Sequence, residues 1–200
     1  MSMAPNKRRF TIAEYRAFEE DSEAKHEFYQ GEIFAMAGAS IRHNEIAGNI
    51  YAWLHTALRG KGCRPYGGDQ RISIQKKRLY TYSDTAVICG SVARDDEDPQ
   101  AATNPRVIFE VLSKSTEGYD RGQKWEYYQQ LDSLQEYVLV SQEEAKVTRY
   151  FRSDDGSWRY QLISGIDQGL DLTSIGCRLP LVDMYDNVKL GPDDETPATA

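Results

Sequence analysis

The stretch that decides the fold is Arg106-Val107-Ile108-Phe109-Glu110-Val111-Leu112-Ser113, an apolar run with one carboxylate in its middle. Its length and its branched residues are typical of a β-strand that is buried on both faces. An ionised carboxylate in such a strand costs several kcal/mol unless a cation or hydrogen-bond donors meet it. Glu110 therefore needs a partner from elsewhere in the chain, or a raised pKa.

A second apolar run, residues 79–89, carries another acid, Asp84. We expect it to be one strand that lies beside the Glu110 strand. Two carboxylates on neighbouring strands suit a hard cation such as Mg²⁺, which proteins bind through one or two carboxylates together with water and substrate phosphate. Such an ion can activate water for attack on a phosphodiester. Asp84 and Glu110 are therefore candidate metal ligands, although Asp84 also fits the simpler role of capping a turn.

The segments around these two runs predict a mixed α/β fold. A helix over residues 117–131 followed by a strand over 135–141 would make a right-handed βαβ unit with a parallel strand pair. Helical spacing of apolar residues predicts a core-facing helix over residues 40–58. Residues 147–151 and 158–163 read as a hairpin, and a short last element is expected near residues 179–185.

The N-terminal part adds a helix and a hairpin. Thr11-Ile12-Ala13-Glu14 reads as a capping box that starts a helix with Tyr15 and Phe18 facing inward. A Gln30-Gly31 turn between two alternating runs predicts a hairpin over residues 26–36.

Length and composition indicate one domain. The chain has 200 residues, 40% of them hydrophobic, which is enough for one core. We expect a single domain over residues 10–188, with flexible termini at 1–9 and 189–200. No apolar run approaches the roughly 20 residues of a membrane span, and no secretory signal is evident at the start, so the expectation is a soluble, cytoplasmic protein without membrane contact.

Charge and cysteine usage restrict the partners. The net charge of −7 argues against a protein that coats nucleic acid nonspecifically, so any DNA contact must be local. The acidic run at residues 95–98 reads as a solvated loop. Cys63, Cys89 and Cys177 have no metal-ligand spacing, and we expect reduced thiols instead of a disulfide or a zinc site.

The cation that a charged phosphate would need has two candidates. Lys124 lies on the predicted 117–131 helix and shares a face with Asp120 and Tyr128 at i, i+4 spacing, from which it could offset charge that grows on phosphorus. Lys114 follows the Glu110 strand directly. The alternative interpretation of Asp120 and Lys124 is an exposed helical ion pair worth a few tenths of a kcal/mol.

Several segments together carry a resemblance to a known family. They are Glu27-Phe28-Tyr29-Gln30-Gly31-Glu32-Ile33, His43, Tyr82-Ser83-Asp84, Asn104-Pro105, residues 107–116, residues 119–128 and residues 134–140. They span roughly residues 10 to 185, and in combination the chain resembles the Uma-two-type restriction endonuclease family, a branch of the PD-(D/E)XK nuclease superfamily. The resemblance implies an α/β fold with a restriction-endonuclease-like mixed β-sheet core flanked by helices. It also implies Mg²⁺-dependent cleavage of DNA, with Asp84 and Glu110 as metal ligands and Glu27 assisting the metal or its water.

The chain departs from the superfamily pattern at two positions. Ser83 stands where the superfamily has proline, which affects backbone shape only. Leu112 stands where a lysine is expected two residues after Glu110, and we expect Lys124 to take its place from the helix. Ser113 and Lys114 are candidate substrate contacts. His43 is either a contact to phosphate or base, or a solvated polar residue at a helix start.

The first functional hypothesis is thus a Mg²⁺-dependent DNA endonuclease that Mn²⁺ could also support, acting as a homodimer. The alternative is a noncatalytic nuclease-fold module that binds a protein or nucleic-acid partner, for which the absent lysine at position 112 and the acidic surface are the arguments. A third hypothesis is a metal-assisted phosphohydrolase that acts on a small nucleotide.

Overall fold

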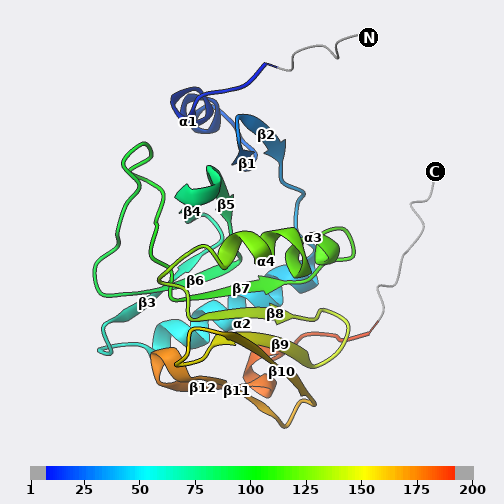
Figure 1. The fold of residues 1–200 in the computed structure, drawn as a ribbon. Helices are drawn as coiled ribbons and strands as arrows, with labels where there is room; N and C mark the ends of the chain where they lie inside the picture. Colours follow the sequence, from blue (N-terminus) through cyan, green and yellow to red (C-terminus); the bar gives the residue numbers. More distant parts are fainter. Residues whose placement is uncertain (1–7, 192–200) are drawn as a thin grey trace, which may run out of the picture.

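The structure, a computed structural model, describes residues 8–191, and its main feature is a six-stranded sheet with helices on both faces (Figure 1). A four-stranded sheet and a two-stranded sheet complete the architecture. The α-helices are α1 (Ile12–Glu20), α2 (Ile41–Ala57), α3 (Glu117–Arg121), α4 (Gln123–Tyr128) and α5 (Leu181–Met184). The strands are β1 (His26–Tyr29), β2 (Glu32–Ala35), β3 (Cys63–Gly67), β4 (Arg71–Ile74), β5 (Leu79–Tyr82), β6 (Thr85–Cys89), β7 (Val107–Val111), β8 (Glu136–Val140), β9 (Lys146–Arg152), β10 (Trp158–Ser164), β11 (Gly169–Leu172) and β12 (Cys177–Pro180).

The large sheet has the order β10-β9-β8-β7-β6-β3. Its central pair, β7 and β8, is parallel, and every other neighbouring pair is antiparallel. The helices α3 and α4 connect the two parallel strands, as the βαβ pattern in the sequence predicts. The mixed α/β fold is therefore confirmed.

The two faces of β7 have different surroundings. Val107, Phe109 and Val111 pack in one core with the buried side of α2, where each fully buried aliphatic or aromatic side chain contributes about 1.5–3 kcal/mol. Ile108 lies in a second core that includes Tyr128 of α4. Since side chains alternate along a strand, Glu110 points to the α4 face.

The predicted capping box and hairpin are both present. Thr11 Oγ1 accepts a hydrogen bond from Glu14 N (3.2 Å), and Glu14 Oε2 accepts one from Thr11 N (2.8 Å). Tyr15 of α1 is buried, but the prediction for Phe18 was wrong, because 44% of its surface is exposed. The β1–β2 turn has positive φ at Gln30 (49°) and Gly31 (92°), a conformation that suits a two-residue hairpin.

Residues 79–89 are not one strand, as the sequence suggested, but two strands in different sheets. β5 lies between β1 and β4 in the four-stranded sheet, which has the order β2-β1-β5-β4, whereas β6 belongs to the large sheet. Ser83 and Asp84 form the break between them. Asp84 therefore lies where the chain passes from one sheet to the other.

The predicted 117–131 helix is also broken. Gly122 separates α3 from α4, and a Cβ there would lie 3.0 Å from the carbonyl oxygen of Gly118. Strands β3 and β11 were not predicted, and the expected last element at 179–185 contains the end of β12 and all of α5.

The acidic run at 95–98 is only partly solvated. Asp95 and Asp98 are 4% and 0% exposed, so the interpretation as a solvated loop was wrong for both. Asp95 accepts hydrogen bonds from Ser73 Oγ (2.7 Å) and Tyr80 OH (2.9 Å). Asp98 forms an ion pair with Arg71. These remote partners offset the cost of burying the two acids.

The expectation of three reduced thiols was also wrong. A disulfide joins Cys63 of β3 to Cys89 of β6, which are directly opposite in the antiparallel register, and Cys177 is free. Most of the predicted flexible termini, residues 1–7 and 192–200, fall outside the described residues. Within residues 8–191, no helix combines the length and the hydrophobicity needed to cross a bilayer.

Candidate active site

Asp84 is held at the junction of the two sheets by contacts to one of its oxygens. Asp84 Oδ2 accepts a hydrogen bond from Val111 N (2.6 Å) and lies 3.2 Å from His43 Nε2. No donor among residues 8–191 meets Oδ1 within hydrogen-bond distance. Because the side chain is 22% exposed, one carboxylate oxygen is fixed by the protein and the group as a whole reaches solvent.

Glu110 projects from β7 into the α4 side of the sheet. Its Oε1 accepts a hydrogen bond from Tyr128 OH (3.0 Å) and lies 2.9 Å from Lys124 Nζ. Burial raises its pKa well above the ordinary value of 4.5; the Lys124 charge lowers it, and the charges of Asp120 and Asp84 raise it again. The carboxylate that the sequence singled out thus has both the partner and the raised pKa that its position requires.

Lys124 reaches Glu110 from α4. Its Nζ donates to the carbonyl oxygen of Tyr82 (3.1 Å) and lies 3.5 Å from Asp120 Oδ1. Burial lowers the pKa of Lys124, but the carboxylates of Glu110 and Asp120 raise it by more, so that the net pKa lies well above 10.5 and the ammonium stays charged.

The alternative interpretation of Asp120 and Lys124 as an exposed helical pair was therefore wrong. Their residues are 3% and 5% exposed. Burial raises the pKa of Asp120, and Lys124 lowers it. Leu112, which occupies the expected lysine position, is 6% exposed and packs in the core beside α4. The cation is thus supplied by the helix, as the sequence predicted from geometry.

Glu27 approaches the same group from β1. Its Oε1 accepts a hydrogen bond from Thr81 Oγ1, and its Oε2 accepts one from Tyr119 OH (3.1 Å). The Tyr119 ring lies between this carboxylate and Lys124, whose Nζ is 6.0 Å from the ring centroid. The negative charge of Glu27 adds to the charges of Glu110 and Asp120, which raise the pKa of Lys124. The structure therefore brings together the four predicted residues Glu27, Asp84, Glu110 and Lys124.

The sequence matches a known protein family over most of its length. The Uma2 family model, described as "Putative restriction endonuclease", matches residues 12–180. The chain belongs to the Uma2 family. Two Synechocystis proteins, named "Uncharacterized protein slr1290" and "Uncharacterized protein sll1609", are each 37% identical to it, over 163 and 148 residues. These matches cover 82% and 74% of this chain and 84% of each relative.

The fold comparison gives the same result. The crystal structure of "a putative nuclease belonging to DUF820" from Anabaena variabilis matches with a TM-score of 0.73 at 15% sequence identity. The match covers 90% of this chain and 99% of that chain. The Uma2 chain therefore has a nuclease-like fold, as predicted.

The site has an excess of acid. Glu110 and Asp120 contact the buried cation Lys124, while the charge of Glu27 acts on Lys124 and that of Asp84 acts on Glu110. Clusters of perturbed carboxylates of this kind are characteristic of functional sites. They favour a positively charged ligand, because a further cation would relieve the repulsion among the acids.

Unpaired polar atoms gather at the same place. Five buried side-chain atoms of the described chain lack a hydrogen-bond partner, and three of them are Ser83 Oγ, Thr85 Oγ1 and His43 Nδ1, next to Asp84 in sequence or in contact with it. Buried polar groups are normally paired, and exceptions mark functional positions or ordered solvent.

The donor set fits a hydrated hard cation. In the part of the chain that the structure describes, no three His, Cys, Asp or Glu side chains are grouped as a ready metal site. Mg²⁺ needs only one or two carboxylates with water and phosphate, and Asp84 and Glu110 are the carboxylates that could hold it.

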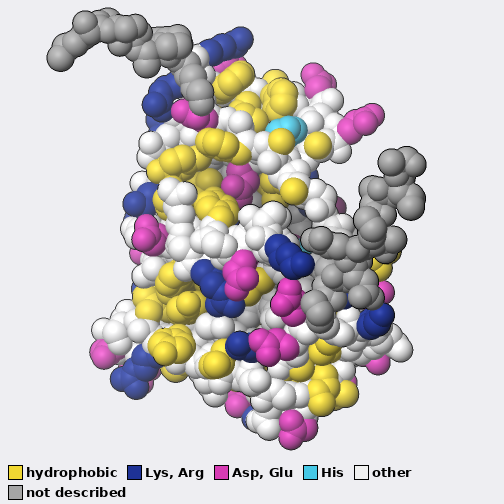
Figure 2. Space-filling model, turned by 90° about the vertical axis from the view of Figure 1, so that its right-hand side faces the viewer, with side chains coloured by type: hydrophobic (Ala, Val, Ile, Leu, Met, Phe, Trp, Pro, Cys, Tyr) yellow, Lys and Arg dark blue, Asp and Glu magenta, His cyan; other side chains and the backbone are white. Residues whose placement is uncertain are grey.

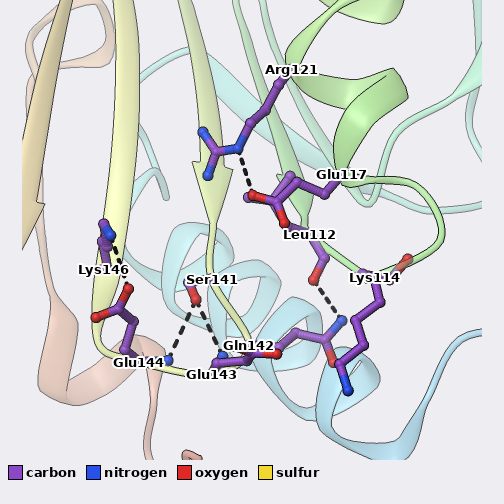
Figure 3. A pocket seen from close by; sticks show the side chains of 10 residues that line it. Leu112, Lys114, Glu117, Arg121, Ser141, Gln142, Glu143, Glu144 and Lys146 are labelled. Carbon is purple, nitrogen blue, oxygen red and sulfur yellow. Dashed lines mark hydrogen bonds and ion pairs between the residues drawn. The ribbon is translucent and has the colours of Figure 1, made fainter. Parts of the chain in front are cut away.

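A pocket of about 160 Å³ lies beyond the end of β7, between α3 and the turn from β8 to β9 (Figure 3). Ser113 and Lys114 line it, and Lys114 is exposed. Ser113 Oγ accepts a hydrogen bond from Thr116 N (3.2 Å), so this hydroxyl stabilises the loop before α3. The wall also carries Gln142, whose Nε2 donates to the carbonyl oxygen of Leu112 (2.7 Å).

Gln142 was not predicted as a site residue, because a glutamine after a strand is usually an ordinary surface residue. The hypothesis that His43 is solvated was wrong, since its side chain is 14% exposed and faces Asp84. On the face in Figure 2, the described Lys and Arg side chains are interspersed with Asp and Glu and form no continuous basic stripe. This mixed charge agrees with the expectation that any DNA contact is local.

Proposed function

We propose that this Uma2 protein is a Mg²⁺-dependent endonuclease that hydrolyses phosphodiester bonds of DNA, with Asp84 and Glu110 as the metal ligands. The observation that carries the proposal is the 2.9 Å contact between Lys124 Nζ and Glu110 Oε1, deep in a site with excess acid. The superfamily has a lysine two residues after the strand carboxylate, where this chain has Leu112. The buried Lys124, beside Glu110, supplies a cation in place of that lysine.

Mg²⁺ bound there would lower the pKa of a water and offset negative charge on the phosphoryl group. Asp84 is oriented by Val111 N through Oδ2, which leaves Oδ1 for the ion. Glu110 remains close to Lys124, whose charged ammonium stabilises the negative charge that grows during attack on phosphorus. Glu27, fixed by Thr81 and Tyr119, acts as an acceptor that orients the attacking water.

DNA phosphates would be held by the loop after β7. Lys114 is exposed there and lines the pocket in the loop that follows the Glu110 strand, and Ser113 stabilises the same loop. Arg121 and Lys146 line the pocket too, and each forms an ion pair with a glutamate, Glu117 and Glu144 respectively (Figure 3). A few local phosphate contacts suit a protein with net charge −7 better than an extended basic groove does.

The proposal is tested by nicking of supercoiled plasmid in Mg²⁺, in Mn²⁺ and in chelator. Asp84→Asn and Glu110→Gln should each reduce cleavage by about 10²-fold or more, the scale of losing one charge-stabilising group. Asp132→Asn is the matched control, since Asp132 is an exposed acid paired with Lys76.

Calorimetric titration with Mn²⁺ separates binding from catalysis. Unchanged Mn²⁺ affinity in Asp84→Ala and Glu110→Ala would refute the metal site. Metal binding without cleavage of any DNA substrate would favour the noncatalytic binding module instead.

We also propose a twofold homodimer, which would present two sites to the two strands of a duplex. The described edge strand β10 exposes Tyr160 (73%) and Leu162 (55%). If β10 paired antiparallel with its copy about Gln161, Tyr160 of each copy would lie opposite Leu162 of the other. Tyr160→Lys should shift sedimentation toward the monomer, whereas Val182→Lys, at another exposed apolar position (55%), should not. A monomeric wild type would refute the dimer.

A further inference from the structure

We infer that His43 is a positioning residue for Asp84 and that Ser40 and Gln142 hold His43 in place. The inference rests on the proposed metal site and deepens it. It assigns a task to a histidine and a glutamine that neither the carboxylate pattern nor the family resemblance explains.

His43 lies in the first turn of α2, on the opposite side of the large sheet from Lys124. Its Nε2 is 3.2 Å from Asp84 Oδ2. Its backbone N donates to the side chain of the N-cap residue, Ser40 Oγ (3.1 Å). The start of α2 therefore fixes the position from which the imidazole reaches Asp84.

The cap is tied in turn to the end of β7. Ser40 Oγ donates to Gln142 Oε1 (2.9 Å), and Gln142 Nε2 donates to the carbonyl oxygen of Leu112 (2.7 Å). The residue before Leu112 is Val111, whose N donates to Asp84 Oδ2 (2.6 Å). The contacts thus connect Asp84 to His43, His43 to Ser40, Ser40 to Gln142, and Gln142 to the end of β7, which in turn contacts Asp84. We call this closed set of contacts the circuit.

Two side chains of the circuit lie largely out of water: Gln142 is 9% exposed and the His43 side chain is 14% exposed, whereas Ser40 is an exposed cap residue. Both polar ends of the Gln142 side chain are used, one by each neighbouring element. Buried side chains that are paired in this way have fixed rotamers, which is how supporting residues orient a metal-binding group.

The ring nitrogens show what His43 does. Nδ1 is buried and meets no partner in the described chain, so the polar contact of the ring is the one from Nε2 to Asp84. With Nδ1 buried and Nε2 lying 3.2 Å from Asp84 Oδ2, the contact to Asp84 is the polar interaction that the ring makes in the described chain, and orientation of Asp84 is the task it fits.

The effect on Asp84 is to fix one oxygen and present the other. Two groups from different elements meet at Oδ2: Val111 N donates a hydrogen bond to it, and His43 Nε2 lies 3.2 Å from it. With the hydrogen bond alone, the carboxylate could turn about that bond. With both contacts it turns less freely, and Oδ1 is the oxygen that these two groups leave unoccupied.

The test is calorimetric titration with Mn²⁺ of chelator-treated protein. His43→Leu should weaken binding about tenfold or more, the usual cost of removing a supporting partner of a metal ligand. His43→Gln, whose amide can donate to Asp84, should recover most of the affinity. His55→Leu is the control, because His55 is an exposed histidine in the last turn of the same helix.

A second pair of variants keeps the test decisive if His43→Leu fails to fold. The side-chain amide of asparagine is one bond shorter than that of glutamine, so His43→Asn should bind Mn²⁺ more weakly than His43→Gln. Equal affinity of the two would overturn the inference. Gln142→Leu should weaken Mn²⁺ binding in the same direction as His43→Leu, and unchanged affinity would remove Ser40 and Gln142 from the circuit.

Failure of this inference differs from failure of the metal site. If Asp84→Asn abolishes Mn²⁺ binding and His43→Leu leaves it unchanged, only the positioning role is wrong. If Asp84→Asn itself leaves binding unchanged, the metal site and the positioning role are both wrong. A purely structural role for His43 would lower the melting temperature of both His43→Leu and His43→Gln without a difference between them in Mn²⁺ affinity.

Discussion

Replacing Lys124 by methionine should destabilise the protein strongly even without metal. Lys124 and Glu110 have side chains that are 6% and 5% exposed, so water screens their 2.9 Å contact little. Removing one partner of a buried ion pair typically costs about 3–5 kcal/mol. We take the lower end, about 3 kcal/mol, because the raised pKa of Glu110 allows the stranded carboxylate to take up a proton. For a chain of this size, that corresponds to a melting temperature about 6–12 °C lower.

Thermal unfolding followed by circular dichroism in chelator is the assay. Lys76→Met is the matched control: Lys76 Nζ lies 2.8 Å from Asp132 Oδ1, but the side chains are 57% and 86% exposed. Such an exposed pair contributes little to the free energy of unfolding, and we expect no measurable change in the melting temperature of Lys76→Met. The double variant Lys124→Met/Glu110→Gln should recover part of the loss, because only Asp120, and no longer Glu110 as well, is then left without the lysine.

The cost of Lys124→Met should also depend on pH. Without the ammonium, Glu110 binds a proton more readily in the folded protein, so that the variant loses stability relative to wild type as the pH rises from 5 to 8. If Lys124→Met had the same melting temperature as wild type at pH 8, as is expected of the control Lys76→Met, the reasoning that a charged Lys124 neutralises the buried acids would be refuted.

Three further predictions follow from the same structure. Glu110→Gln should melt above wild type at pH 8 without divalent cation and lose this advantage toward pH 4, because an acid with a raised folded-state pKa destabilises the folded protein as the pH rises, while Lys124 keeps Asp120 as its partner; a lower melting temperature than wild type at pH 8 would contradict an excess of buried acid. Reducing the Cys63–Cys89 disulfide, which closes a loop with a sequence separation of 26, should lower stability by about 3.5 kcal/mol, measured by denaturant unfolding with and without dithiothreitol; coincident curves would mean that the thiols are unpaired in solution. Arg71→Met should cost about 3 kcal/mol, the lower end for a broken buried pair, because the fully buried Asp98 loses its nearer partner and keeps only Arg16 at 3.5 Å, and a melting temperature equal to wild type would show that the Arg71–Asp98 pair does not stabilise the fold.

Local signals in the sequence predicted the local elements well. The Thr11–Glu14 capping box, the Gln30-Gly31 turn and the apolar spacing of α2 each act within a few residues, so the pattern and the structure agree. The βαβ unit was equally accessible, because a helical segment between two buried strands leaves few arrangements.

The errors concern features that depend on distant parts of the chain. Periodicity shows that residues 79–89 are extended, but not that they change sheets at Ser83 and Asp84. The burial of Asp95 and Asp98 depends on partners such as Arg71, Ser73 and Tyr80, which lie 15 to 27 residues away. An acidic run without these partners would be solvated, and composition alone cannot distinguish the two cases.

The residues of the candidate site likewise divide into those that the local sequence indicates and those that depend on distant contacts. Glu110 was identified from its setting alone, because a carboxylate in a buried strand needs a reason. Lys124 was found from its place on the following helix, and the structure puts it beside Glu110. Gln142 was missed, because its importance comes from Ser40 and Leu112, which α2 and β7 bring to it.

Because the cation comes from α4, the β7 strand does not have to supply both a packed hydrophobic side chain and a lysine next to Glu110. Position 112 is free to serve hydrophobic packing, and Leu112 does so at 6% exposure. The distance from Lys124 to Glu110 is then governed by how α4 seats on the sheet, and the α3–α4 break at Gly122 lets that short helix be placed independently of the segment before it. Substitutions in the contacts of α4 would therefore change the distance from Lys124 to Glu110, and with it the pKa of Glu110, while every acid stays unchanged.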